Sequence, residues 1–248
     1  MLSNDVEKMI LVGNKFHEYC RKNNAITVNE FIILLQDGFY NVDKRLKVLL
    51  GQGVNYEDAQ KVLDVYDRVC KDNALIDVSD ISDATLSGKN TFTHKYKVCN
   101  TIIGHAKKID ELNYLVPLLV DENCELLQDH QTGLHIQGIM IVEAFRQAIV
   151  AITEEFLSTQ EQNKQMIVVN YINTTYDFFI FPLPTNIILK VLKKELIGKR
   201  AKFLVRLEAW QNDEPGASCE CEYQLFPSSI MTKTEAKMAF IATNKTLR

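Results

Sequence analysis

The chain has 248 residues, 46% of them hydrophobic, and a formal net charge of −4 at pH 7. Its length allows one large domain or two modest ones, each with a real hydrophobic core. The acidic balance excludes a broad nucleic-acid-binding surface, because phosphate recognition needs a basic one.

No targeting or membrane segment is expected. The first residues, 1–5, hold an aspartate and no basic region before an apolar core, and no apolar run reaches the length of a membrane span. The six cysteines are scattered, except for Cys219 and Cys221. These two alternate with polar residues, which predicts a strand with both thiols facing the core and no metal site. The sequence therefore predicts a cytoplasmic protein with no cofactor, no metal, and neither membrane nor nucleic acid as a partner.

Residues 1–76 are expected to form a separate mixed unit of helices and strands, whose role the sequence leaves open. Residues 9–13 are strand-like. Thr27 and Glu30 have the spacing of a capping box, which predicts a helix over residues 28–36. Residues 56–71 have one apolar face and predict an amphipathic helix. The polar stretch 77–90 is expected to be a linker or loop.

From residue 90 onward the pattern is that of strands around one long helix. Two strands are expected first, over 93–103 and 111–120, with a short connection between them and a loop over 121–137 after them. The helix is predicted over 138–157. Strands follow over 165–181, 186–196, 200–210 and 217–226, and residues 229–248 are expected to be a polar tail.

The predicted helix is apolar on nearly all sides over its first four turns, so it must be surrounded by protein. A curved antiparallel sheet wrapped around one central helix satisfies this need, and it is the hotdog architecture. The sequence thus predicts an α+β chain with a hotdog domain over residues 90–228. Two such half-covered sheets would pair edge to edge, which predicts a homodimer.

Only three polar residues interrupt the apolar helix. Glu143, Arg146 and Gln147 are spaced i,i+3 and i,i+4, so they share one face. Buried charges need partners or a polar cavity. Either Glu143 and Arg146 form a structural salt bridge, or Glu143 acts as a base in a substrate pocket while Arg146 or Gln147 binds an oxyanion.

A second group of candidates precedes the helix. Asp129, His130 and His135 lie just upstream of its N-terminus, where backbone N–H groups favour negative charge and could polarise a thioester carbonyl. Gly138 opens the helix and lets a ligand approach the backbone closely. The alternative for both histidines is hydrogen bonding within the loop.

These residues resemble the A-factor biosynthesis hotdog family. The resemblance is carried by His94-Lys95, by Asp129-His130, and by the string from Glu143 to Gln147, and it covers about residues 92–226. Members of that family take part in γ-butyrolactone signalling-molecule synthesis, a branch of secondary metabolism. They condense a β-ketoacyl group, carried on acyl carrier protein, with the hydroxyl group of dihydroxyacetone phosphate.

The resemblance implies an acyltransferase acting on a thioester of acyl carrier protein or coenzyme A. The implied catalytic residues are Glu143, Arg146 and His130. Glu143 would be the general base or an orienting carboxylate, Arg146 an anion or oxyanion partner, and His130 would line the pocket entrance. The implied substrate-binding residues are His94, Lys95, Asp129, His135, Gly138 and Gln147.

The chain departs from the family in one respect: it has a single copy of the helix motif, where family members commonly carry two tandem hotdog repeats. A homodimer would supply a second copy. Two other hypotheses stay open, a hotdog dehydratase or thioesterase, and a non-catalytic scaffold that holds an acyl chain or carrier protein.

Overall fold

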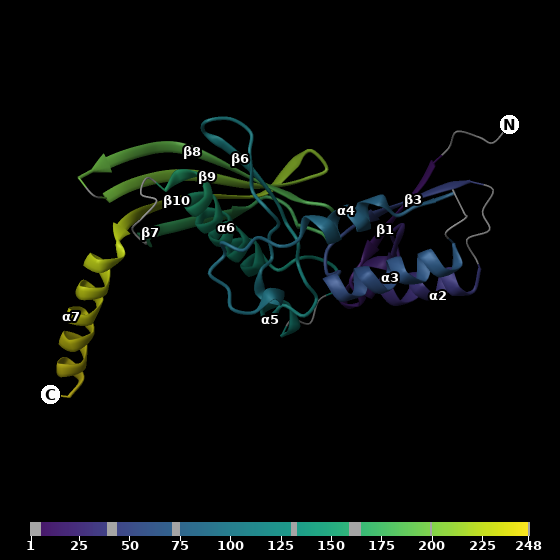
Figure 1. Ribbon diagram of the computed structural model, residues 1–248, viewed down its shortest axis with the longest axis horizontal. Coiled ribbons are helices and arrows are strands. Elements are labelled where there is room, and N and C mark those ends of the chain that lie inside the picture. Colours follow the sequence, from purple (N-terminus) through teal and green to yellow (C-terminus); the bar gives the residue numbers. More distant parts are fainter. Residues whose placement is uncertain are drawn as a thin grey trace.

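Two sheets organise the chain, and they lie side by side along its long axis (Figure 1). The computed structural model describes residues 6–38, 44–70, 75–129, 133–158, 165–198 and 200–247. The first sheet has four strands in the order β2-β1-β3-β4, and the second has six in the order β5-β6-β8-β9-β10-β7. The architecture is therefore mixed, with a small α/β unit at one end and a larger sheet-and-helix unit beside it.

The four strands of the N-terminal unit are all parallel. Parallel neighbours need crossover connections, and helices supply most of them. The elements are β1 (Val6–Val12), η1 (Asn14–Phe16), α1 (His17–Cys20), β2 (Ala25–Thr27), α2 (Val28–Gln36), β3 (Arg45–Leu50), α3 (Tyr56–Val69), β4 (Ile76–Asp77) and α4 (Ser79–Ser87).

The predicted start of α2 is confirmed in detail. The Thr27 hydroxyl accepts a hydrogen bond from the Glu30 amide at 3.3 Å, and the Thr27 amide donates to the Glu30 carboxylate at 3.1 Å. This reciprocal pair satisfies two N–H groups that a helix start leaves open. The strand over 9–13 and the amphipathic helix of α3 are confirmed as well.

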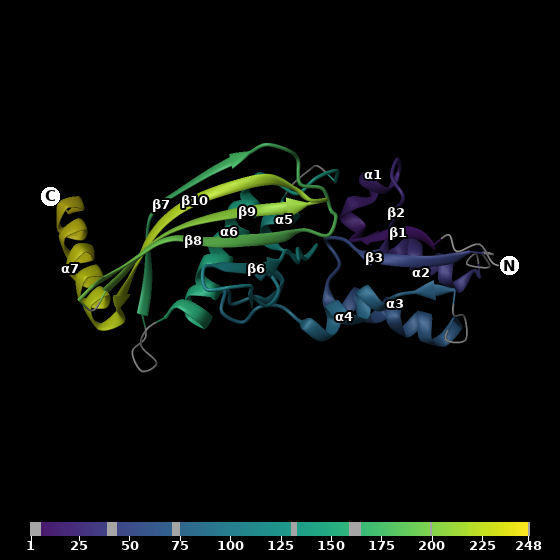
Figure 2. The same cartoon turned by 90° about the horizontal axis from the view of Figure 1, so that it is seen from above.

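The second unit has the hotdog fold that the sequence predicts. Its antiparallel sheet curves over the helix α6, as the view from above in Figure 2 shows. The elements are η2 (Val98–Asn100), β5 (Lys107–Lys108), β6 (Asn113–Pro117), α5 (Glu125–Gln128), α6 (Gly138–Ile152), η3 (Thr153–Leu157), β7 (Gln165–Tyr176), β8 (Asn186–Ile197), β9 (Arg200–Gln211), β10 (Glu214–Pro227) and α7 (Ser228–Thr246).

The helix α6 and the core-facing thiols are as predicted. Ala144, Phe145 and Ala148 are fully buried beneath the sheet, and Cys219 and Cys221 of β10 are buried with them. A helix with apolar residues on most sides is stable in water only when protein covers those sides.

Two expectations about local structure are wrong, and a third feature, the C-terminal helix, was not predicted. Residues 93–103 form no strand; the edge next to β6 is formed by β5, which lies in the segment expected to be a connection. The predicted linker contains α4, whose start Asp77 stabilises by accepting a hydrogen bond from the Ser79 amide at 3.0 Å. The described part of the polar tail is the helix α7, which has no buried residue.

The two units meet at the carboxyl ends of β1 and β3. Gly13 and Gly53 lie so close that a Cβ at Gly13 would be 2.3 Å from the Gly53 carbonyl oxygen. The side chain of Gln52 crosses into the hotdog unit, and Val12 and Phe16 share a core with α6. Because the two units share this core, the boundaries 1–76, 90–228 and 229–248 remain a proposal.

Candidate functional site

The helix α6 carries a compact charged cluster on the face that the sequence predicts. One oxygen of Glu143, Oε1, accepts hydrogen bonds from Arg146 Nη2 at 2.8 Å, Gln147 Nε2 at 2.9 Å and Lys95 Nζ at 2.7 Å. The other, Oε2, accepts from Arg146 Nε at 2.8 Å. We call Lys95, Glu143, Arg146 and Gln147 the Glu143 cluster.

The cluster also holds the segment 93–102 against α6. Gln147 is fully buried; its Nε2 donates to the Asn100 carbonyl at 2.8 Å, and its Oε1 accepts from the Ile102 amide at 3.0 Å. Arg146 Nη2 donates to the Thr93 carbonyl at 3.3 Å. Side chains of α6 thus take up backbone groups that a strand would have paired with a neighbouring strand, which is why this segment is irregular.

Glu143 is held in its ionised form. Burial by itself would raise the pKa of this carboxyl group, but hydrogen bonds from Arg146, Lys95 and Gln147 outweigh it and lower the pKa to about 2. A carboxylate with so low a pKa is a weak proton acceptor at neutral pH. The geometry therefore favours the orienting carboxylate over the general base among the two roles that the resemblance implies.

The cations of the cluster keep access to solvent. The Lys95 and Arg146 side chains are 27% and 31% exposed, whereas Glu143 is 15% exposed. Within the described residues, Nη1 of Arg146 makes no hydrogen bond. Two cations share one carboxylate, so the cluster has a net positive charge that can attract an anionic or oxyanionic group.

His94 lies beside the cluster but is not part of it. Its ring pairs with Glu154 of η3, and its backbone lies in the left-handed region at φ 56°. That conformation is uncommon for a residue with a side chain. This backbone conformation lets the neighbouring side chains of His94 and Lys95 reach different carboxylates, Glu154 and Glu143 respectively.

The N-terminus of α6 forms a second group of candidate residues, separate from the Glu143 cluster. The side chain of Gln137, the residue before this helix, makes no capping hydrogen bond. The hydroxyl of Tyr176, at the end of β7, donates to the Gly138 carbonyl at 2.8 Å, and a Cβ at Gly138 would be 3.0 Å from that ring. The ring of His135 packs against Phe179, with centroids 4.8 Å apart.

Two of the candidates that the sequence predicts remain. Asp129 follows the short helix α5, and His130 lies outside the residues that the structure describes. The structure thus brings together Lys95, Glu143, Arg146 and Gln147. It adds Tyr176, which binds Gly138 at the start of α6, and Phe179, which packs against His135. Sequence reasoning missed both because they lie about 40 residues after their partners.

The described residues contain no group of three or more His, Cys, Asp or Glu side chains placed to hold a metal ion. The cluster itself is rich in hydrogen-bond donors, with one ammonium, one guanidinium and one amide around a single carboxylate. Such a set suits anions and carbonyl oxygens.

The curved sheet over one central helix defines a hotdog protein. Residues 76–227 match the A-factor biosynthesis hotdog domain (AfsA), which is more than half of the chain. The chain belongs to the A-factor biosynthesis hotdog family.

Solved structures with a similar fold include a thioesterase from Haemophilus influenzae, at 11% identity and a TM-score of 0.40, covering 56% of this chain and 87% of that one. A mutant thioesterase from Pseudomonas aeruginosa is 15% identical with a TM-score of 0.36, covering 50% of this chain and 81% of that one. A comparison with curated proteins found no match. In the described part of the chain, no helix combines the length and apolar character needed to cross a membrane.

Proposed function

We propose that this protein is an acyl-thioester enzyme. In this proposal it transfers a β-ketoacyl group from acyl carrier protein to a hydroxyl acceptor such as dihydroxyacetone phosphate, as a step in the synthesis of a γ-butyrolactone or related signalling molecule. Membership of the A-factor biosynthesis hotdog family supports this proposal. The observation that carries it is the Glu143 cluster, where two partly exposed cations flank one carboxylate on the central helix.

The cluster would act by binding and orientation. Arg146 Nη1 and the ammonium of Lys95 would hold the acceptor phosphate or the oxyanion that forms at the thioester carbon. Glu143 would fix both cations, since it binds each of them directly. The acceptor oxygen attacks the carbonyl carbon, a C–O bond forms, the C–S bond breaks, and the hydroxyl proton ends on the released thiol.

The test is intact-mass analysis of a β-ketoacyl carrier protein incubated with the purified protein. We expect the acyl group to leave the carrier protein only when dihydroxyacetone phosphate is present, because transfer needs the acceptor oxygen. The acylated acceptor should appear in equal amount.

Other outcomes would contradict this reading. Loss of the acyl group without an acceptor would mean hydrolysis and make the protein a thioesterase. Loss of one water from a β-hydroxyacyl carrier protein would make it a dehydratase. A carrier protein left unchanged throughout would overturn the donor and acceptor named here. If that unchanged carrier protein nevertheless bound saturably, the result would favour a non-catalytic scaffold.

We also propose that the protein forms a homodimer through β7. This strand ends the sheet order, so one of its edges has no neighbour in the described residues. Val169 and Tyr171 on it are 40% and 41% exposed. A long edge strand with apolar side chains favours pairing with another strand, and a second copy supplies an identical one.

Val169→Lys should therefore shift the protein from dimer to monomer, because a charge on the edge opposes strand pairing. Analytical ultracentrifugation measures the change. Ile109→Lys, next to β5 at the opposite edge of the same sheet, is the matched control and should stay dimeric. A wild-type protein that is monomeric at all concentrations would disprove the interface.

A further inference from the structure

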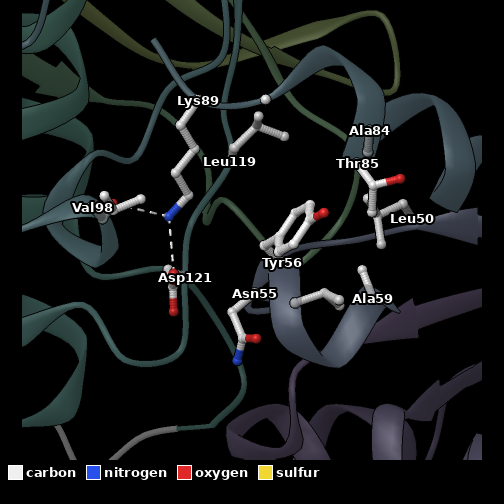
Figure 3. A pocket seen from close by; sticks show the side chains of 12 residues that line it. Leu50, Asn55, Tyr56, Ala59, Ala84, Thr85, Lys89, Val98, Leu119 and Asp121 are labelled. Carbon is white, nitrogen blue, oxygen red and sulfur yellow. Dashed lines mark hydrogen bonds and ion pairs between the residues drawn. The ribbon is translucent and has the colours of Figure 1, made fainter. Parts of the chain in front are cut away.

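A cavity of about 200 Å³ lies where the α/β unit meets the hotdog unit. Figure 3 shows its walls, which come from the end of β3, from α3 and α4, and from the hotdog segments around Val98 and Leu119. It lies apart from the Glu143 cluster, none of whose members line it. Ligand sites favour such junctions between units, and in parallel sheets they favour the carboxyl edge, next to the point where strand order reverses.

That edge is the one at which the cavity lies. Leu50, the last residue of β3, lines the cavity together with residues of α3 and α4. Half of the residues that line the cavity are aliphatic, namely Leu50, Val54, Ala59, Ala84, Val98 and Leu119.

Two large apolar residues border the cavity and remain open to solvent. Tyr56 is 63% exposed and Val98 is 72% exposed. Exposed apolar side chains at the mouth of an apolar cavity indicate a surface that gains stability when a ligand covers it.

One polar group can orient a ligand in this cavity. Lys89 Nζ donates to Asp121 Oδ2 at 3.0 Å and to the Val98 carbonyl at 3.3 Å (Figure 3). An ammonium has three N–H groups, so among the residues that the structure describes one N–H of Lys89 remains for a ligand. The Lys89 and Asp121 side chains are only 18% and 8% exposed. Because little water reaches this pair, a hydrogen bond from Lys89 to a ligand is stronger than it would be in water.

The charge around the cavity selects the kind of ligand. Asp121 neutralises Lys89 at contact distance, and Asp58, which binds the lining residue Asn55, is paired with Lys61 at 2.9 Å, so these charges balance. A ligand carboxylate would bring a further charge into a poorly solvated site whose charges already balance, at a desolvation cost, whereas a neutral carbonyl oxygen accepts from Lys89 without that cost. We propose that this cavity binds a neutral, mainly aliphatic molecule with one carbonyl group, whose oxygen accepts a hydrogen bond from Lys89.

The probes are 2-octanone and octanoate, which share a chain length and differ in the charge of the head group. Isothermal titration calorimetry on the full chain should give saturable binding of 2-octanone, with octanoate at least ten-fold weaker. Ala84→Phe fills the cavity and should weaken 2-octanone at least ten-fold. Ala236→Phe, on the exposed helix α7, is the matched control and should bind as the wild type does.

Val98→Trp gives an independent block at the mouth of the cavity, and an exposed position tolerates it in the fold. It should weaken 2-octanone at least ten-fold, whatever the stability of Ala84→Phe. Octanoate binding as tightly as the ketone would overturn the choice of a neutral head group. Absence of ketone binding to the wild type, or binding unchanged in both blocked variants, would overturn the site.

Discussion

Glu143→Ala is expected to lower the free energy of unfolding by roughly 2–3 kcal/mol at neutral pH and acyl transfer by at least about 100-fold. The variant leaves Lys95 and Arg146 without the carboxylate that binds both, and Gln147 loses one acceptor. Urea unfolding and the intact-mass assay measure the two effects. Glu155→Ala, an exposed position on η3, is the matched control and should change neither.

The stability effect of Glu143 should depend on pH with a defined sign. The folded pKa is lowered to about 2 from an ordinary value of 4.5. The ionised carboxylate therefore stabilises the fold fully above about pH 4.5, and this stabilisation is lost as the pH falls toward 2. The difference in unfolding free energy between wild type and Glu143→Ala should shrink over that window. A difference that stays constant from pH 7 to pH 3 would contradict the assignment.

The pH profile of the wild-type enzyme separates orientation from base catalysis. An orienting carboxylate with so low a pKa adds no acid limb to the transfer rate between pH 5 and 8. In the orienting role, Lys95→Met should raise the KM for dihydroxyacetone phosphate more than it lowers kcat. An acid limb that vanishes in Glu143→Gln would instead identify Glu143 as the base.

Gln52→Leu is the second change with a large expected effect, about 3 kcal/mol of stability. This side chain is 2% exposed and makes three hydrogen bonds into the hotdog unit. Its Nε2 donates to the Leu118 carbonyl at 3.0 Å and the Leu183 carbonyl at 3.1 Å, and its Oε1 accepts from the Val120 amide at 2.8 Å. Leucine fills the same space and leaves all three backbone groups without this partner.

Urea unfolding measures the loss, and amide hydrogen exchange at Val120 should become faster because its acceptor is gone. Gln36→Leu, at the exposed end of α2, provides the matched control and should cost less than about 0.5 kcal/mol. Equal stability of the two variants would show that Gln52 does not join the units.

Patterns that repeat within one element were readable from the sequence. The helix α6 follows from apolar residues on nearly every side, and the capping box of α2 from two residues three positions apart. The shared face of Glu143, Arg146 and Gln147 follows from helical spacing, because residues three and four apart are neighbours on any helix. Strands β7 to β10 follow from runs of branched and aromatic residues.

Contacts between distant parts of the chain were decided only by the tertiary structure. Lys95 reaches Glu143 across 48 positions, and Gln147 takes the backbone groups of Asn100 and Ile102, so a segment with strand-like composition forms no strand. Gln52 reaches three backbone groups between Leu118 and Leu183, and Tyr176 reaches Gly138. Periodicity reports which side of an element is apolar; which polar group meets which depends on how the elements pack, and no local pattern encodes that.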